Sequence, residues 1–343
     1  MNIKYVPVLR YISEERKALI SISSLKKTIP LLELVRERPG QKRTGTFQDT
    51  YLEDFSRFKF PILIDIPAYM NINKGTRDGV RDFVDKFKQN IHLKVDYYKL
   101  LSINKNIIPV LSYMPKCVYV QGELKLDYLE LKKSFNRVAF RIFNSKHLNA
   151  MLIDISKVIT NNDILIYDLD KASPNDPQAA IIIRWVNKLK STVKFTSIII
   201  RSSINSEVKY KNLIDGRIVN EIDNSLLKDY VKLGFNAFGD FAGIRKDSTI
   251  SKGGYAVVSP GFLQYSWHIN SFIGYKARFD DYKEFINHIK PSITSSTYWK
   301  RYTDKHHKNC PGCLGLEAGS STQYRDWKRY ALQHYLYTME EFL

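Results

Sequence analysis

Eight short apolar runs in this sequence each carry a polar side chain near the carboxyl end. The acids among these side chains are of the types that hold a divalent ion or activate water, and the arginines are of the type that neutralises developing negative charge. A cluster of both would suit metal-assisted or acid–base chemistry on a phosphorylated substrate. The eight residues are Arg10, Glu33, Asp65, Ser112, Arg141, Asp168, Arg201 and Asp240.

We assign candidate roles to these residues by their chemistry. The candidate catalytic acids are Asp65, Asp168, Asp240 and Glu33, and a divalent metal held by the three aspartates is left open. A hydroxyl, two glycines that allow close backbone approach and a histidine in the segment after the eighth strand extend the set of binding residues. The candidate ligand- or phosphate-binding residues are Arg10, Arg141, Arg201, Ser202, Gly239, Gly243 and His268.

A second candidate site is the segment KHHKNCPGC, in which Cys310 and Cys313 enclose a tight Pro-Gly turn. Two thiolates at this spacing can bind one metal ion. A closed zinc site needs two further ligands, and the residues that could supply them are His306, His307, His334 and Cys117. Since no second Cys-x-x-Cys occurs, zinc at Cys310 and Cys313 is left open but not favoured, and we expect an exposed turn with two free thiols.

The apolar runs that carry the polar side chains have the length of strands buried on both faces. They cover residues 5–10, 28–34, 60–66, 107–113, 138–143, 163–169, 196–202 and 235–241. Between them lie segments with apolar residues at helical spacing, such as 148–159 and 179–189. Strands and helices therefore alternate, which predicts parallel strands joined by helical crossovers.

Eight such units predict an α/β protein with a closed, TIM-like (β/α)8 barrel. Active sites of this fold lie at the carboxyl ends of the strands, so the polar residues are expected to converge at the barrel mouth. Side chains alternate along a strand, and the prediction requires the faces that carry Asp65, Asp168, Arg201 and Asp240 to point inwards. The alternative is an open doubly wound sheet, although neither G-x-G-x-x-G after the first strand nor a P-loop supports it.

We expect the barrel to span residues 1–290, including a strand-bearing insertion at 245–281 after the eighth strand. The insertion contains the segments YAVVSP and YSWHIN and is predicted to lie over the mouth, with Trp267 and His268 as lid residues. Residues 291–343 are predicted to form a C-terminal helical extension that contains the Cys-x-x-Cys loop. Its last part, from about Tyr324 to Phe342, is expected to be an amphipathic helix.

The charge of the chain favours a polyanionic partner, such as nucleic acid or a nucleotide, since 53 Lys plus Arg against 35 Asp plus Glu give +18. The alternative is that lysines spread through almost every segment reflect the base composition of the genome. A hydrophobic content of 44% excludes a disordered chain. No run of about 18 apolar residues predicts a membrane span, and the N-terminus does not resemble a secretory signal. We therefore expect a cytoplasmic protein without a membrane partner.

Short segments spread over nearly the whole chain carry a resemblance to a known family. They are KYVPVLR, IPLLE, FPILID, DLD at Asp168 to Asp170, GDFAGI and WKRYALQHYL. Together they resemble the beta protein family of temperate phages, phage satellites and bacterial genomes. The resemblance implies a setting of phage and host conflict, in a defence or immunity locus with a neighbouring partner gene, and it implies no catalytic residues.

Two classes of function follow from these observations. In the first, an antiviral defence protein uses the barrel mouth to bind, and potentially to process, a phosphorylated or nucleic-acid ligand. In the second, the barrel is a non-catalytic sensor or regulatory subunit that binds a partner effector or a phage protein. Whether the protein is an enzyme is left undecided, since no known catalytic motif accompanies the charged residues.

Overall fold

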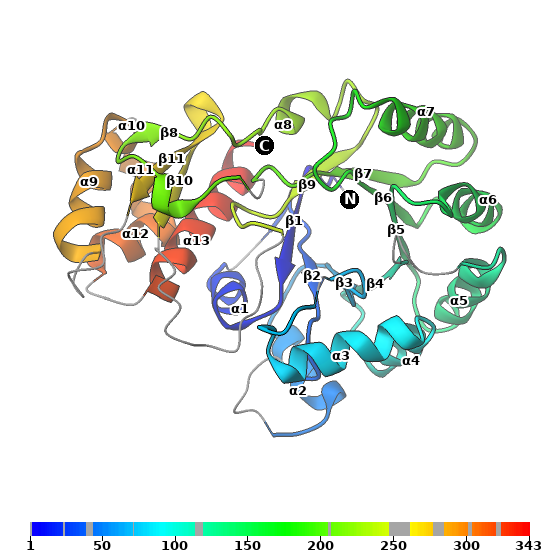
Figure 1. Cartoon of the computed structure of the whole chain (residues 1–343). Coiled ribbons are helices and arrows are strands. Elements are labelled where there is room, and N and C mark those ends of the chain that lie inside the picture. Colours follow the sequence, from blue (N-terminus) through cyan, green and yellow to red (C-terminus); the bar gives the residue numbers. More distant parts are fainter. Residues whose placement is uncertain are drawn as a thin grey trace.

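A closed barrel of eight parallel strands, surrounded by helices, forms the centre of the computed structural model (Figure 1). The structure describes residues 2–22, 25–38, 44–70, 72–113, 119–204, 207–246, 261–276, 285–300, 304–319 and 324–343. The barrel strands are β1 (Tyr5–Arg10), β2 (Leu31–Glu33), β3 (Ile62–Asp65), β4 (Ile107–Ser112), β5 (Ala139–Phe143), β6 (Ile164–Asp168), β7 (Thr196–Ile200) and β9 (Ala237–Asp240). The last and first strands pair in parallel, with Phe238 opposite Tyr5. The predicted (β/α)8 fold is therefore confirmed, and the open sheet is excluded.

The barrel strands are buried on both faces, which explains why they are continuous apolar runs. One set of alternate side chains forms the barrel interior and contacts no helix residue of the core; it includes Val8, Leu63 and Ile166. The other set, which includes Leu9 and Ile64, packs in a larger cluster with residues of the surrounding helices. Membership of these two clusters shows which face of each strand points inwards.

The helices of the barrel follow their strands and form the outer layer. They are α1 (Ser13–Ile20), α2 (Phe47–Phe55), α3 (Asp78–Gln89), α4 (Leu93–Leu100), α5 (Glu123–Lys132), α6 (Leu148–Val158), α7 (Pro177–Thr192) and the short α8 (Leu226–Asp229). Local signals begin some of them: Asp176 accepts hydrogen bonds from the first turn of α7, and Thr46 forms a capping box with Asp49 at α2. No helix within the described ranges combines the length and apolar character that a membrane crossing requires.

A small antiparallel sheet lies beside the barrel, next to the C-terminal helices (Figure 1). Its strands are β10 (Gly261–Ser266), β11 (Ser271–Lys276) and β8 (Arg217–Ile218). The first two form a hairpin within the predicted insertion, whose residues 247–260 and 277–281 lie outside the described residues. The third strand comes from the connection between β7 and β9, so the sheet joins segments on both sides of the last barrel strand.

The C-terminal segment is helical, as predicted. A π-helical turn (Phe285–Ile289) leads into α9 (Lys290–Ser295), α10 (Thr297–Lys300), α11 (Asp304–Asn309), α12 (Pro311–Ala318) and α13 (Tyr324–Phe342). The last helix packs against the first strand and the first helix of the barrel: the ring of Tyr335 lies 6.1 Å from that of Tyr5, and Lys328 pairs with Glu15 at 2.5 Å. The end of the chain therefore completes the outer layer over β1 and β9.

Gly239 lies where the barrel interior is closely packed around the backbone of β9, and its substitution measures that packing. A Cβ atom at this position would lie 2.5 Å from the backbone oxygen of Val6 and 2.8 Å from Cγ1 of Ile200. We expect Gly239→Ala to lower the free energy of unfolding by about 1–3 kcal/mol, because an interior of native density has no room for a methyl group. Denaturant unfolding measures this change.

The matched control is Gly79→Ala in the first turn of α3, where an added Cβ meets no atom within 4 Å. That substitution is expected to stabilise the protein by up to about 1 kcal/mol, because alanine loses less backbone entropy in a helix. Equal effects of the two substitutions would contradict the packing described for Gly239.

Candidate functional site at the barrel mouth

Six of the eight polar residues at strand ends share the interior face of their strands. Arg10, Glu33 and Asp65 are register partners across β1, β2 and β3, and Ser112 is the partner of Arg141. Each alternates with apolar interior residues of its strand. The mouth is therefore a polar layer above an apolar interior, and its residues are Arg10, Glu33, Asp65, Ser112, Arg141 and Asp168.

Arg141 is the centre of this layer and is fully buried. Its Nη1 donates to Glu33 Oε1 and to Asp65 Oδ2, both at 2.9 Å. Its Nη2 and Nε donate to Asp168 Oδ2 at 2.6 and 3.1 Å. One guanidinium therefore compensates three carboxylates from three different strands, using the fixed fork of donors that arginine provides.

A lysine from the outer layer extends the network. Lys94 of α4 donates to the backbone oxygen of Ser112 at 2.6 Å and to its hydroxyl at 2.9 Å. That hydroxyl donates to Asp65 at 2.5 Å, and the lysine ammonium lies 3.8 Å from the same carboxylate. Sequence reasoning missed Lys94, although its spacing of four residues from the buried Tyr98 places both on the core-facing side of α4.

Aromatic rings and a further lysine form the rim. The ammonium of Lys246 lies 5.4 Å from the ring centres of Tyr69 and Phe241 and 5.5 Å from that of Phe143. It pairs with Asp170 at 2.8 Å and lies 3.5 Å from Asp168. Both Lys246 and Tyr69 are in loops after strands, where no periodic pattern marks a residue as part of a site.

Two hydrogen bonds join the rim to the buried layer and to the first strand. Tyr69 donates its hydroxyl to Glu33, and Arg10 donates to the backbone oxygen of Lys246. Nε of Arg10 also lies 3.9 Å from Oε2 of Glu33. The loops after β3 and β9 are therefore held over the ends of β1 and β2.

The protonation states of the cluster follow from this geometry. Burial lowers the pKa of Arg141, but the carboxylates of Asp168, Glu33 and Asp65 outweigh that effect, so its pKa is raised well above the ordinary value. Burial raises the pKa of Asp168, but Lys246 and Arg141 outweigh it and the pKa is lowered. Burial also raises the pKa of Tyr69 well above its ordinary value. The arginine and Asp168 are thus charged, and the tyrosine is protonated.

The same geometry bears on the predicted divalent metal. The carboxylates of Glu33, Asp65 and Asp168 surround the guanidinium of Arg141 at hydrogen-bonding distance. The divalent ion was predicted at Asp65, Asp168 and Asp240, and these three do not converge. Asp65 and Asp168 share the Arg141 guanidinium, whereas Asp240 bonds to Tyr5 and Tyr335 on the other face of its strand. In this arrangement the network supplies its own counter-ion.

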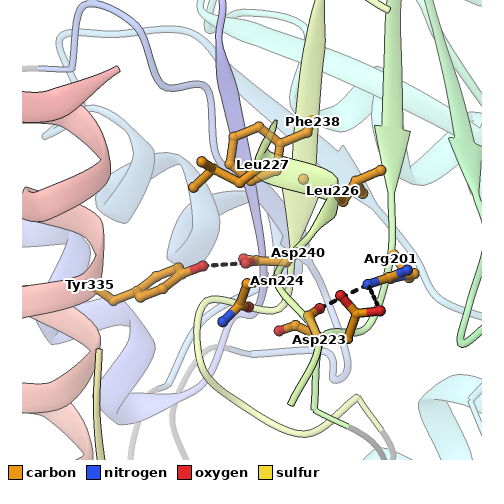
Figure 2. Close-up of a pocket in the computed structure, with 10 residues that line it drawn as sticks. Arg201, Asp223, Asn224, Leu226, Leu227, Phe238, Asp240 and Tyr335 are labelled. Atoms are coloured by element: carbon orange, nitrogen blue, oxygen red, sulfur yellow. Dashed lines mark hydrogen bonds and ion pairs between the residues drawn. The ribbon is translucent and has the colours of Figure 1, made fainter. Parts of the chain in front are cut away.

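Asp240 does not belong to the mouth, and the prediction that its face of the strand points inwards is wrong. It accepts hydrogen bonds from Tyr5 at 2.6 Å and from Tyr335, on the side of the strand that faces α13 (Figure 2). Burial raises its pKa above the ordinary value. The cavity beside it measures about 10 Å³, which accommodates a single water at most.

Arg201 also points away from the barrel interior. Its Nη2 donates to the backbone oxygen of Asp223 at 2.9 Å and pairs with the Asp223 carboxylate at 2.7 Å (Figure 2). The interior residues of β7 are Ile198 and Ile200. Arg201 directly follows Ile200, so its side chain points to the opposite face of the strand. Ser202 has interior parity, and its backbone N–H donates to the oxygen of Asp170 at 2.7 Å.

The remaining candidate residues have structural surroundings. Gly239 faces the packed interior described above, where a side chain has no room. Packing therefore explains this glycine, in place of the predicted contact with a ligand. Gly243 has a φ of 74°, in the left-handed region that favours glycine, and its position is explained by the turn after the last barrel strand. His268 is exposed in the 3-10 turn Trp267–Ile269 between β10 and β11, and it does not contribute to the cluster around Arg141.

The cysteine loop differs from the exposed turn that we expected. Cys310 and Cys313 are both buried, and the motif opens α12, where Cys310 accepts a hydrogen bond from the backbone N–H of Cys313 at 3.4 Å. His306 and His334 lie beside the two thiols. His307 stacks on Trp299 with 4.3 Å between ring centres, and Cys117 lies outside the described residues.

The fold and the mouth define a TIM-type barrel protein with a buried, arginine-centred charge cluster at the carboxyl ends of its strands. Comparison of the chain with protein-family models and with curated proteins found no match.

Proposed function

We propose that the barrel mouth is a recognition site for a ligand with phosphate or another anionic group, in a protein that acts in phage and host conflict. The observation that carries the proposal is the pair of cations at the rim. The side chains of Arg10 and Lys246 are 14% and 12% exposed, whereas those of Arg141 and Lys94 are 0% and 2% exposed. A ligand that enters the mouth would meet the two rim cations first, and both can donate charge-assisted hydrogen bonds to phosphate oxygens.

The protonation states favour recognition over acid–base catalysis. A general acid or base works best when its pKa lies near the working pH. Lys246 and Arg141 outweigh burial and lower the pKa of Asp168, and burial raises the pKa of Tyr69, so both shifts lead away from neutrality. We therefore propose a sensor or regulatory subunit that binds its ligand without transforming it.

The setting in phage and host conflict rests on sequence segments. The segments KYVPVLR, FPILID and GDFAGI, with the others named above, resemble the beta protein family. Two of them overlap the strands that pair at the closure of the barrel, since KYVPVLR includes β1 and GDFAGI begins in β9. A net charge of +18 agrees with an anionic ligand such as RNA, DNA or a nucleotide. A partner protein from the same locus would then bind the ligand-bound form of the chain.

A binding assay with Lys246→Met tests the proposal. Methionine keeps the length of the side chain and its contact with the three rings, and it removes the charge. We expect the wild-type chain to bind a labelled single-stranded RNA or ATP, with an affinity that falls as salt rises. The substitution is expected to weaken the binding about tenfold or more, because a hydrogen bond to a charged group contributes roughly 1.5–3 kcal/mol.

Lys188→Met is the matched control, because it makes the same change of charge. Lys188 is exposed near the carboxyl end of α7, at the opposite end of the barrel from the mouth. We expect this variant to bind like the wild-type chain. Equal binding by both variants, or the absence of binding to either probe at low salt, would contradict the proposal. In cells that express the protein, phage plating should show protection with the wild type and Lys188→Met but not with Lys246→Met.

A further inference from the structure

Four side chains with metal-binding atoms converge in the C-terminal part of the chain, away from the barrel mouth. They are His306 of α11, Cys310 and Cys313 at the start of α12, and His334 of α13, and all four are buried. Their donor atoms all lie within 4.8 Å of one another. His334 therefore meets three residues of which the nearest in sequence, Cys313, is 21 positions away.

The spacing of the donor atoms fits a tetrahedral metal site. Nδ1 of His334 lies 3.4 Å from Sγ of Cys313 and 3.6 Å from Sγ of Cys310. With Zn–S bonds of about 2.3 Å and Zn–N bonds of about 2.0–2.1 Å, a tetrahedral angle places sulfur and nitrogen about 3.6 Å apart. The ligands are thus already close to the separation that zinc imposes.

Both histidines are also oriented as metal ligands usually are. Nε2 of His334 lies 3.0 Å from the backbone oxygen of Tyr265, and Nδ1 of His306 lies 3.1 Å from a carboxylate oxygen of Glu341. In metal sites the ring nitrogen that does not bind the metal commonly donates to a carbonyl or a carboxylate, which fixes the tautomer and the ring orientation. The oxygens of Tyr265 and Glu341 are therefore in the positions of supporting groups.

A glycine allows the cysteine turn to approach the last helix. A Cβ atom at Gly312 would lie 2.3 Å from the backbone oxygen of Tyr330 and 2.4 Å from the backbone nitrogen of His334. Any side chain at this position would push the turn away from α13 and separate the thiols from His334. The Cys-Pro-Gly-Cys sequence thus serves the contact with the fourth ligand.

We propose that His306, Cys310, Cys313 and His334 bind one zinc ion in a closed Cys2His2 site. Four protein ligands leave no open position, so the role of the ion is structural. The site joins α11 and α12 to α13 and, through the carbonyl of Tyr265, to β10. Because the neighbouring Tyr335 reaches Asp240 of the last barrel strand, zinc also anchors the helix that covers the barrel closure.

Metal analysis of the full-length chain tests the proposal. The protein is expressed with zinc in the medium, desalted, and measured by inductively coupled plasma mass spectrometry. We expect about one zinc per chain, as in structural sites of this ligand set. Replacement of zinc by Co²⁺ should give the visible absorption of tetrahedral cobalt with thiolate ligands. A strong chelator should remove the metal from the wild-type chain and lower its melting temperature.

Substitutions then identify the ligands. Cys313→Ser and His334→Asn should each lower the zinc content severalfold, and Cys117→Ser, which removes the remaining cysteine, should not change it. A chain that contains no zinc, or that loses it equally in Cys117→Ser, would contradict the proposal. A disulfide between Cys310 and Cys313 in the protein isolated without reductant would contradict it as well. The cobalt spectrum of the wild type keeps the test decisive if a ligand variant does not fold.

Discussion

Arg141→Met is expected to lower the free energy of unfolding by about 3–5 kcal/mol, because it removes the shared hydrogen-bond donor of three buried carboxylates and leaves them only the more distant cations of Arg10, Lys94 and Lys246. Its guanidinium is the shared donor to Glu33, Asp65 and Asp168. Each of these three residues is at most 1% exposed. Methionine fills a similar volume, so the loss would report charge and not a cavity. Denaturant unfolding at neutral pH measures the change.

Acid should reduce the damage in this variant. Burial raises the pKa of Asp168, but Lys246 and Arg141 outweigh it and lower that pKa in the wild type. The part of the difference that comes from Asp168 should therefore shrink as the pH falls through the lowered value. Arg141→Lys should have an intermediate effect, because lysine keeps the charge but lacks the planar fork of donors. Arg57→Met, in an exposed pair with Glu53, is expected to cost about 0.5 kcal/mol or less. An Arg141→Met variant as stable as the wild type would show that the cluster is not the buried network described.

The second large effect is a contrast between two aspartates at strand ends, Asp168 and Asp240. Lys246 and Arg141 outweigh burial and lower the pKa of Asp168, so its ionised form is favoured in the folded state. Its contribution to stability is present above the ordinary pKa and is lost as the pH falls through the lowered value. Burial raises the pKa of Asp240, so its contribution is present below the ordinary pKa and is lost as the pH rises through the raised value.

The two asparagine variants should therefore have opposite pH profiles. We expect Asp168→Asn to cost about 3 kcal/mol near neutral pH, because it removes a partner of the buried Arg141. Asp240→Asn should cost about 1 kcal/mol or less there, because the loss of hydrogen bonds from Tyr5 and Tyr335 is offset by removal of a buried charge. Unfolding free energies are measured from below the ordinary aspartate pKa, where folded Asp168 loses its charge, up to neutral pH.

The sign of the pH dependence decides the result. The stability of wild type relative to Asp168→Asn should rise with pH, and that relative to Asp240→Asn should fall with pH. Parallel profiles would contradict the assignment of Asp168 to the cation-rich mouth and of Asp240 to the tyrosine pair under α13. Binding of RNA or ATP should be unaffected by Asp240→Asn, which separates its structural role from the site at the mouth.

Most of the barrel could be predicted from the sequence, because the features that define it are local. Each strand is a continuous apolar run, and each helix has apolar residues at helical spacing. The order of strands and helices can therefore be predicted without knowledge of tertiary contacts. The polar ends of β3 and β6 face inwards, as the prediction required, and Asp65 and Asp168 meet at Arg141. The helix over 324–342 could be predicted from the same helical spacing of apolar residues.

The orientation of β7 and β9 could not be predicted in this way. Both faces of these strands are apolar, since Ile198 lies inside and Ile199 outside, and Ala237 lies inside and Phe238 outside. When both faces are buried, hydrophobicity does not distinguish them, and only the closure of the barrel selects the inner one. The positions of Arg201 and Asp240 relative to the mouth were therefore undecidable from the pattern.

The sequence by itself determined the succession of strands and helices, the residue types available at the strand ends, and the Cys-x-x-Cys turn. The tertiary structure alone decided which of these side chains meet. Lys246 reaches Asp168 over 78 positions of chain, and His334 reaches Cys313 over 21 positions. Such contacts arise when distant elements pack on a common core, and short-range periodicity contains no information about that packing.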